Sequence, residues 1–416
     1  MPTEFRNGSF QLKFAPESSF GTMNTNVYSY GEYFGIHSAL KFPDPTHNYK
    51  PVYGLSKNSR GGASRSWQFI IPGTQEFAGS FNNIILTSGH ILPFILGKES
   101  ASTKTADSGN QYIQHLIQED NDIPSFTMDA RYFNIDPAYA DFIRRWYGCK
   151  IDNATIYCEE GEHLKLSINK LVAKNMIHNV SEVADDAEEP NKDYLREQYK
   201  YSSSLTDENA NEYFYSGERD PYLFSECFLR ISDGGQELNS DNNRTLARLL
   251  NFSLSIDNNL RSQYYLTNDT GGGDQYLIPY EILPGRREYK LTLTCEIMDW
   301  KFYKFLMNRG KYGNEFRGLG ISIEFFKRYG IIEVPTNTLK IYIPGVDNEH
   351  SWEYNVTDIN PISGDLALNQ HLGAFPFSAD HSVTEDIRPK VNLTMTVPSV
   401  SFIVNDSYGR YLDIRG

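Results

Sequence analysis

Positive charge is scarce in this sequence relative to negative charge. The 416 residues include 39 Lys and Arg but 53 Asp and Glu, which gives a formal net charge of -14 at pH 7. Proteins that bind nucleic acid neutralise its phosphates with a basic surface. The charge balance argues against that class of binder, because an acidic surface repels DNA.

Long apolar runs are also absent. No stretch reaches the roughly 18 apolar residues that a membrane-spanning helix needs. The first residues, Met1 to Gly8, lack the basic and apolar regions of a secretory signal. We therefore expect a soluble chain that is made in the cytoplasm and does not insert into a membrane.

Cysteine is rare and widely spaced. Cys149, Cys158, Cys227 and Cys295 form no C-x-x-C pair, so the sequence indicates neither a zinc site nor a disulfide framework. A reducing compartment fits this usage. We expect Cys149 and Cys158 to act as small buried hydrophobes.

Catalytic motifs are missing as well. The sequence contains no H-E-x-x-H, no G-x-S-x-G and no G-x-x-x-x-G-K-[ST], and its nine histidines are scattered. Paired acids such as Glu159 and Glu160 are adjacent, and adjacent residues of a strand point to opposite faces. We predict no catalytic, cofactor-binding or metal residue, no cofactor, and a protein that is not an enzyme.

The sequence is rich in aromatic residues, which make up 14% of it with 28 Tyr and 25 Phe. This content favours strands, so we predict a mainly β protein. One pattern occurs twice, at residues 71–85 and 283–297, with an offset of 212 (284 minus 72). Both copies read apolar-Pro-Gly-x-x-Glu-aromatic and then alternate, which predicts a turn followed by a half-buried strand.

The segments after each copy also agree, although chance similarity between two β-rich segments is the alternative. Each copy precedes a predicted short helix, at 90–96 and 300–307. Predicted strands follow at 125–133 and 321–326, and closing strands at 164–168 and 339–343. The offset between the two closing strands is 175 (339 minus 164), so the first unit has 37 more residues before its closing strand than the second (212 minus 175). We expect two similar β domains with short helices.

Composition suggests where these domains begin and end. Residues 1–63 hold many Gly, Tyr and Phe without a periodic segment and predict an N-terminal arm that lies across a neighbour. Residues 64–180 form the first β domain, with a long exposed loop from Lys98 to Asn121, and 221–416 form the second. Residues 181–220, with twelve acidic and four basic side chains, predict an acidic interdomain linker on the outer surface.

Several short segments resemble one family, the tail tube proteins of long-tailed bacteriophages and related archaeal viruses. They span most of the chain apart from the acidic linker, and their order carries the resemblance. The segments are Glu17–Thr22, Ser125–Met128, Gly148–Ile156, Phe252–Leu260 and Val397–Val400.

The resemblance implies a β-sandwich or split-barrel subunit whose strands join those of its neighbours into an inner barrel. Rings of such subunits stack into the tube of the virion tail, through which viral double-stranded DNA passes without specific binding. Two tandem units imply trimeric, pseudo-hexameric rings. The loop at 98–121 and the arm are candidates for contacts between rings. This chain departs from the family in its long acidic linker, which puts the domain pairing in doubt.

The resemblance also implies partners and leaves alternatives. The partners are other copies of the chain and further tail proteins, namely tape measure, tail terminator and distal tail proteins. A distal tail or adaptor ring protein is one alternative, and a carbohydrate-binding or carbohydrate-active β-sandwich protein is another. From the net charge we expect the lumen to be acidic or neutral.

Overall fold

The structure is a computed structural model of the chain. It describes residues 5–25, 27, 32–34, 39–52, 69–105, 111–134, 142–178, 221–232, 247–264, 277–297, 311–312, 315–316, 320–327, 338–343, 375–382, 390–406 and 409–412.

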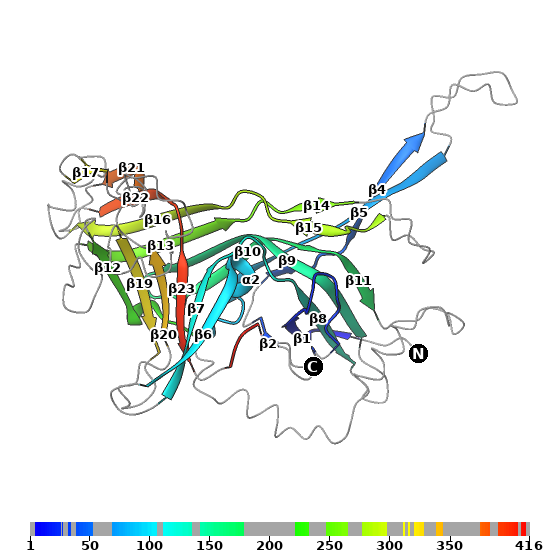
Figure 1. The fold of residues 1–416 in the computed structure, drawn as a ribbon, viewed down its shortest axis with the longest axis horizontal. Helices are drawn as coiled ribbons and strands as arrows, with labels where there is room; N and C mark the ends of the chain where they lie inside the picture. Colours follow the sequence, from blue (N-terminus) through cyan, green and yellow to red (C-terminus); the bar gives the residue numbers. More distant parts are fainter. Residues whose placement is uncertain are drawn as a thin grey trace, which may run out of the picture.

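The described chain is almost entirely β-structure, which confirms the predicted fold class (Figure 1). A thirteen-stranded sheet holds β1 (Phe5–Pro16), β2 (Glu32–Tyr33), β3 (Ala39–Lys41), β4 (Pro45–Val52), β5 (Phe69–Ile85), β8 (Phe126–Asn134), β9 (Phe142–Glu159), β10 (Lys165–Ala173), β11 (Asn175–His178), β13 (Ala247–Asp257), β16 (Glu288–Ile297), β21 (Phe375–Ser382) and β22 (Lys390–Val397). A six-stranded sheet holds β6 (Gly97–Thr105), β7 (Gln111–Glu119), β12 (Cys227–Ser232), β19 (Gly320–Phe326), β20 (Thr338–Ile343) and β23 (Ser401–Asp406). The remaining elements are the pairs β14 (Arg261–Gln263) with β15 (Glu281–Leu283) and β17 (Lys311–Tyr312) with β18 (Glu315–Phe316), and the helical turns α2 (Pro93–Leu96) and η2 (Phe224–Glu226).

Strand β9 joins the two halves of the large sheet. Its first part pairs with β8 and β11, and its second part pairs with β10 on one side and β13 on the other. A continuous row results, in which each strand is antiparallel to the next. We call it the main row, and its order is β3 with β4, β5, β10, β9, β13, β16, β22, β21.

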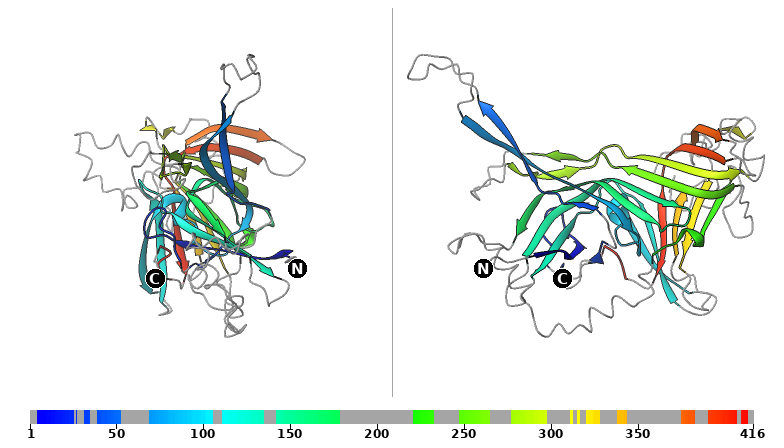
Figure 2. Two further views of the ribbon diagram at one scale, coloured as in Figure 1. Left: turned by 90° about the vertical axis from the view of Figure 1, so that its right-hand side faces the viewer. Right: turned by 180° about the vertical axis from the view of Figure 1, so that it is seen from behind.

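Alternation decides which face of the main row is dry. In β16 the side chains of Tyr289, Leu291, Leu293 and Cys295 are buried, and those between them are exposed or half-buried. Helix α2 and the six-stranded sheet lie on the dry side as a second layer (Figures 1 and 2), and their apolar side chains share one core with the main row. Because β7 pairs with β23, both halves of the sequence build this core.

Several predicted elements are confirmed at their places. The predicted strands at 125–133 and 321–326 lie within β8 and β19, apart from residue 125, and the helix predicted at 90–96 contains α2. The predicted helix at 300–307 and the acidic linker at 181–220 lie outside the described residues. The domain boundaries stay a prediction.

Three local predictions are wrong. The predicted loop at 98–121 is the hairpin β6–β7, whose polar residues suit the sheet edge that β6 forms. The described strands of the predicted arm pair into the large sheet, β1 with β8 and both β3 and β4 with β5. The closing strands do not match, because β10 lies in the main row and β20 in the six-stranded sheet.

The two copies of the repeated pattern differ at the predicted turn. Residues 284–287 separate β15 from β16, whereas β5 continues straight through Pro72 and Gly73. Both glycines nevertheless lie against an asparagine carbonyl of the opposing segment. A Cβ added to Gly73 would lie 1.9 Å from the Asn48 oxygen, and one added to Gly285 would lie 2.6 Å from the Asn259 oxygen. Glycine is therefore required at both places by close backbone approach.

The alternation in β16 gives a test of the dry face. Leu293 is fully buried, so Leu293→Ala should lower the free energy of unfolding by about 2–5 kcal/mol through lost packing and a cavity. Its neighbour Thr292 faces the other side and is half-buried, so Thr292→Ala should change it by less than about 1 kcal/mol. Urea unfolding of the unassembled protein measures both. Equal effects would contradict the assigned faces.

Candidate functional site

The face of the main row that points away from the core is polar and open. Serine, threonine and asparagine dominate it, and every member is exposed or half-buried. Its described side chains, which we call the polar face, are Lys41, Glu76, Ser80, Asn82, Asn83, Asn153, Thr155, Tyr157, Glu159, Lys165, Ser167, Asn169, Lys170, Arg248, Asn251, Ser253, Ser255, Asp257, Glu288, Lys290, Thr292, Thr294, Glu296, Asn392, Thr394 and Thr396.

Strand register aligns these side chains into rows across the sheet. One row runs through Lys165, Tyr157, Ser253, Thr292 and Thr394, which are successive cross-strand partners in β10, β9, β13, β16 and β22. The row crosses both halves of the sequence without a break. The main row therefore presents one continuous hydrophilic surface.

Hydrogen bonds between uncharged groups connect part of this surface. The Asn169 side-chain amide donates to Asn153 Oδ1 at 2.7 Å and to Thr155 Oγ1 at 2.9 Å. The Tyr157 hydroxyl donates to Asn83 Oδ1 on β5. Such groups bind water well and carry no net charge.

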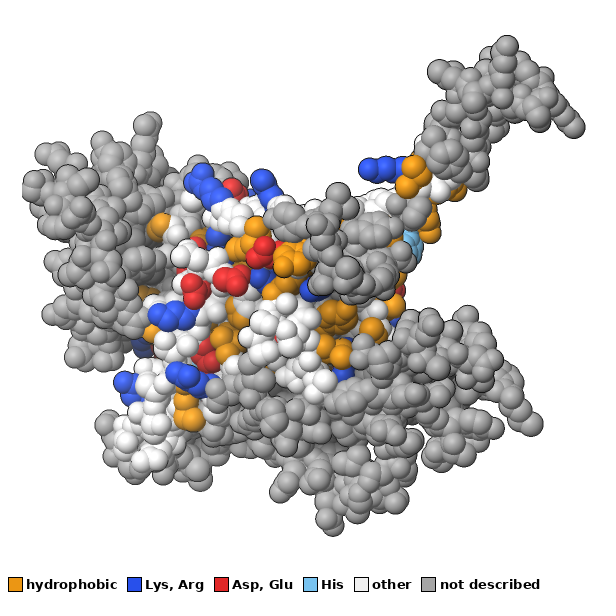
Figure 3. Space-filling view, turned by 45° about the vertical axis from the view of Figure 1, so that its right-hand side comes forward, with side chains coloured by type: hydrophobic (Ala, Val, Ile, Leu, Met, Phe, Trp, Pro, Cys, Tyr) orange, Lys and Arg blue, Asp and Glu red, His pale blue; other side chains and the backbone are white. Residues whose placement is uncertain are grey.

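The charged side chains of the polar face balance one another. Five are acidic and five are basic among the members given above. Some of the bases have acidic neighbours: Lys165 Nζ lies 2.8 Å from Glu162, and Arg248 lies 3.9 Å from Glu296. On the side of the molecule that Figure 3 views, acidic and basic side chains are likewise interspersed where described residues cover it. The described side chains of the polar face form no continuous basic track for a phosphate backbone.

Both ends of the main row are open edges among the described residues. At one end β21 pairs only with β22, and at the other β3 and β4 pair only with β5. An exposed edge offers unpaired backbone groups to another strand. These two edges are the sites at which the sheet can be extended.

A ribbon formed by β4 and β5 projects beyond the body (Figures 1 and 2). Large apolar side chains on it are exposed to solvent, with 59% exposure for Tyr49, 44% for Ile70 and 46% for Ile71. Where this ribbon leaves the body, the Tyr264 hydroxyl at the end of β14 donates to the Gln75 carbonyl at 3.0 Å. Exposed apolar residues on a two-stranded ribbon indicate an interaction surface.

A buried asparagine fixes the bend at which β13 ends and β14 begins. The Asn258 side-chain amide donates to the Ile95 carbonyl at 3.1 Å and the Ile151 carbonyl at 2.9 Å. Its oxygen accepts a 2.6 Å hydrogen bond from Arg287 Nε. This single side chain links α2 and β9 to the two adjacent connections, the one from β13 to β14 and the one from β15 to β16. The main row and the second layer are thereby held together at this bend.

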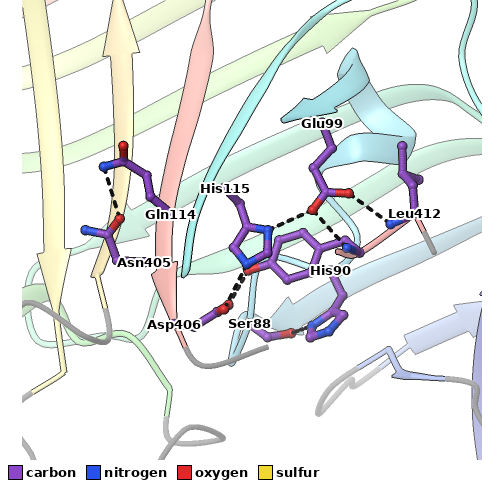
Figure 4. A network of polar contacts seen from close by, with 9 residues as sticks. Ser88, His90, Glu99, Gln114, His115, Asn405, Asp406 and Leu412 are labelled. Atoms are coloured by element: carbon purple, nitrogen blue, oxygen red, sulfur yellow. Dashed lines mark hydrogen bonds and ion pairs between the residues drawn. The ribbon is translucent and has the colours of Figure 1, made fainter. Parts of the chain in front are cut away.

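Near the C-terminal end a histidine lies between two carboxylates (Figure 4). His115 Nδ1 lies 2.7 Å from Glu99 and Nε2 lies 3.0 Å from Asp406. Tyr411 stacks on the imidazole at 3.9 Å and donates its hydroxyl to Asp406. The Tyr411 and Leu412 backbone amides donate to Glu99 at 2.8 and 2.9 Å. We call these residues the C-terminal clamp.

Charges in the clamp stabilise one another. Burial lowers the pKa of His115, but hydrogen bonds to Asp406 and Glu99 outweigh it and raise that pKa to about 9. Burial acts to raise the pKa of Glu99, and its bonds from His115 and the two amides outweigh this and lower it. The histidine is therefore cationic at neutral pH.

A second buried carboxylate anchors the N-terminal segment. Glu17 accepts hydrogen bonds from the Ser125 and Thr127 hydroxyls at 2.6 and 2.8 Å and from the Gly148 and Gly21 amides at 2.7 and 3.0 Å. Burial raises its pKa despite these four donors. Three of the segments that carried the family resemblance thus meet at this one side chain.

No catalytic or ligand residue was predicted, and the described residues contain no group of three or more His, Cys, Asp or Glu placed to hold a metal ion. The described helices include none long and apolar enough to cross a membrane. All four cysteines are free, and burial raises the pKa of each thiol. Sequence reasoning missed the clamp because His115 and Asp406 are 291 residues apart, and only the pairing of β7 with β23 brings them together.

Comparison with protein families gives one match. A family model described as phage tail tube protein matches residues 11–327. No curated protein matches the chain.

The clamp gives a pH-dependent test. Because the folded pKa of His115, about 9, exceeds its unfolded value of about 6.5, its contribution to stability is complete below pH 6.5 and is lost as the pH rises through 9. The lowered pKa of Glu99 means that its share is lost as the pH falls below 4.5. The difference in unfolding free energy between the native protein and His115→Gln should therefore be largest between these limits and shrink toward pH 10. Gln114→Ala, which lies outside the ion cluster and changes no titratable group, is the control variant. An unchanging difference from pH 6 to 10 would contradict the assignment.

Proposed function

The chain belongs to the phage tail tube protein family and is a structural protein of the virion tail, and from this we propose that its copies form stacked rings that make the hollow tail tube. The observation that supports this most directly is the main row, an antiparallel row that is dry on one face and hydrophilic on the other and whose two edges pair with no further described strand. Copies joined edge to edge extend such a row and close it into a barrel. No step of this function needs catalysis or a cofactor.

The size of the main row supports three chains per ring. The row contributes eight strand positions per chain when β3 and β4 count as one. At about 4.8 Å per strand and about 40° of tilt, three chains give a barrel about 48 Å across between backbones, and two chains about 32 Å. Side chains take up roughly 5 Å at each wall. Three chains leave a bore of about 38 Å, with room for a hydrated double helix.

We propose that the polar face lines this bore. Its uncharged Ser, Thr and Asn side chains hold water, and its balanced charges give DNA no row of cations to bind. Binding through phosphate neutralisation would hold each stretch of duplex and slow its passage. A neutral wall therefore suits a conduit for viral double-stranded DNA.

The other tail components are partners in this proposal. The tube ends present the same surfaces as each ring, and these would meet the tape measure, terminator and distal tail proteins. The exposed apolar ribbon of β4 and β5 is the described surface best suited to such contacts.

Electron microscopy of the purified protein tests the proposal. We expect micrographs to show hollow rods, and we expect mass measurement of a single ring to give three copies of the chain. Single rings that never stack would indicate a distal tail or adaptor ring protein instead. Six chains per ring would contradict the count drawn from the main row.

The lining can be tested by charge. Thr155→Lys, Ser253→Lys and Thr292→Lys together place nine added cations in each three-chain ring, so variant tubes should retain duplex DNA at low salt and release it as salt rises. The matched variant with Gln at the same positions should behave like the native tube. DNA retention is measured by co-sedimentation with tubes at several salt concentrations. Strong retention by the native tube would show that the bore is basic and the proposal for the polar face wrong.

A further inference from the structure

The main row consists of two successive groups with the same internal pairing. Each group has four strand positions when β3 and β4 count as one. The first group is β3 with β4, β5, β10 and β9, and the second is β13, β16, β22 and β21. In the first, Phe81 of β5 pairs with Leu40 and Ile168. In the second, Leu293 of β16 pairs with Phe252 and Leu393.

Constant offsets relate the two groups. The offset is 212 for the first two strands (252 minus 40, and 293 minus 81) and 225 for the third at this level (393 minus 168). The offset between the fourth strands is also 225 (379 minus 154), since Ile168 pairs with Ala154 and Leu393 pairs with Ala379. The second group therefore has 13 more residues before its closing strands (225 minus 212), where the sequence comparison had predicted fewer.

Within the chain, the last strand of the first group pairs with the first strand of the second group. This joint between β9 and β13 is antiparallel and runs from Asn251 opposite Glu159 to Asp257 opposite Asn153. The corresponding outer edges of β21 and of β3 with β4 have no pairing strand among the described residues. The chain thus holds one completed joint and both halves of a second.

We propose that β21 of one copy pairs with β3 and the start of β4 of the next copy, in the register of the β9–β13 joint. This inference rests on the proposed function and names the surfaces by which copies meet. In the internal joint Tyr157 of β9 lies opposite Ser253 of β13. The equivalent of Tyr157 in β21 is Ser382 (157 plus 225), and the equivalent of Ser253 in β3 is Lys41 (253 minus 212), so Ser382 should lie opposite Lys41. The same offsets place Ala379 opposite Asp44, because Ala154 is opposite Ile256.

Strand direction agrees with this joint. The main row alternates in direction over eight positions, so its first and last strands run opposite ways. A neighbour placed by rotation about the tube axis then meets β21 with an antiparallel strand, as in the internal joint. An odd number of positions would have forced a parallel joint.

The chemistry of the β3–β4 edge limits how it can pair. Pro43 and Pro45 lack the backbone N–H that a ladder needs, so the edge resists pairing with arbitrary strands. Beside them Phe42 is partly buried against the core and stacks on Trp146 at 4.9 Å. Phe42 occupies the place that Leu254 holds in the internal joint, so the dry face continues across the joint.

Disulfide formation between copies tests the register. Lys41→Cys and Ser382→Cys, made separately and mixed before assembly, should give a cross-linked dimer on mild oxidation, which only contact between copies can produce. The double variant should give closed covalent rings of about three times the 47.6 kDa chain mass on a non-reducing gel. The unmodified protein, whose four cysteines are buried or partly buried, is the control for background cross-linking.

The paired control keeps Lys41→Cys and moves the second cysteine to Ser378→Cys, four residues along β21. In the proposed register it lies about 13 Å from its partner and should not cross-link. Tubes that form normally but cross-link through 378, or through neither position, would overturn the register and leave the proposed function intact. Absence of rings and tubes from the unmodified protein would overturn the proposed function itself.

Discussion

The pairing of β9 with β13 is the interaction on which the rest of the structure depends. Backbone hydrogen bonds across this joint turn two groups of strands into one surface, and the side chains beneath them form one core. Without the joint, each group would be a narrow sheet with two open edges. With it, the described strands of the main row leave one edge at β21 and one at β3 with β4.

The main row separates a dry core, shared with the second layer, from the polar surface on its other side. Alternation achieves this because neighbouring residues of a strand face opposite sides. Residues 181–220 carry -8 of the total -14, while the described side chains of the polar face include as many bases as acids. The net charge of the whole chain is therefore a poor guide to the charge of this one face, and the expectation of an acidic or neutral lumen stays a prediction.

The fold class, the positions of several central strands and the family could be predicted from the sequence, because alternation, aromatic content and short sequence motifs are local signals. The repeat at 71–85 and 283–297 also pointed to strands that hold equivalent places in the main row. The match of 164–168 with 339–343 failed because short apolar strands look alike, and only pairing distinguishes β10 in the main row from β20 in the second layer. His115, Glu99 and Asp406 could not be predicted as a cluster, since each becomes part of it only through strand register.

Two buried charge clusters among the described residues lie where paired strands must meet in one register. Alternation alone cannot prevent a slip of two residues, because such a slip keeps every side chain on its face. A slip at β7 and β23 would separate His115 from Asp406, and a slip at β8 and β9 would separate Arg145 from Asp129, whose carboxylate it contacts at 2.6 Å through two nitrogens. Leaving one such charge buried without its partner costs about 3–5 kcal/mol, which is far more than the few tenths lost when one apolar contact replaces another. In a tube, every copy must present its edges at the same height, so register errors within one chain would spread to its neighbours. The buried ion pairs thus act more by fixing strand register than by adding stability.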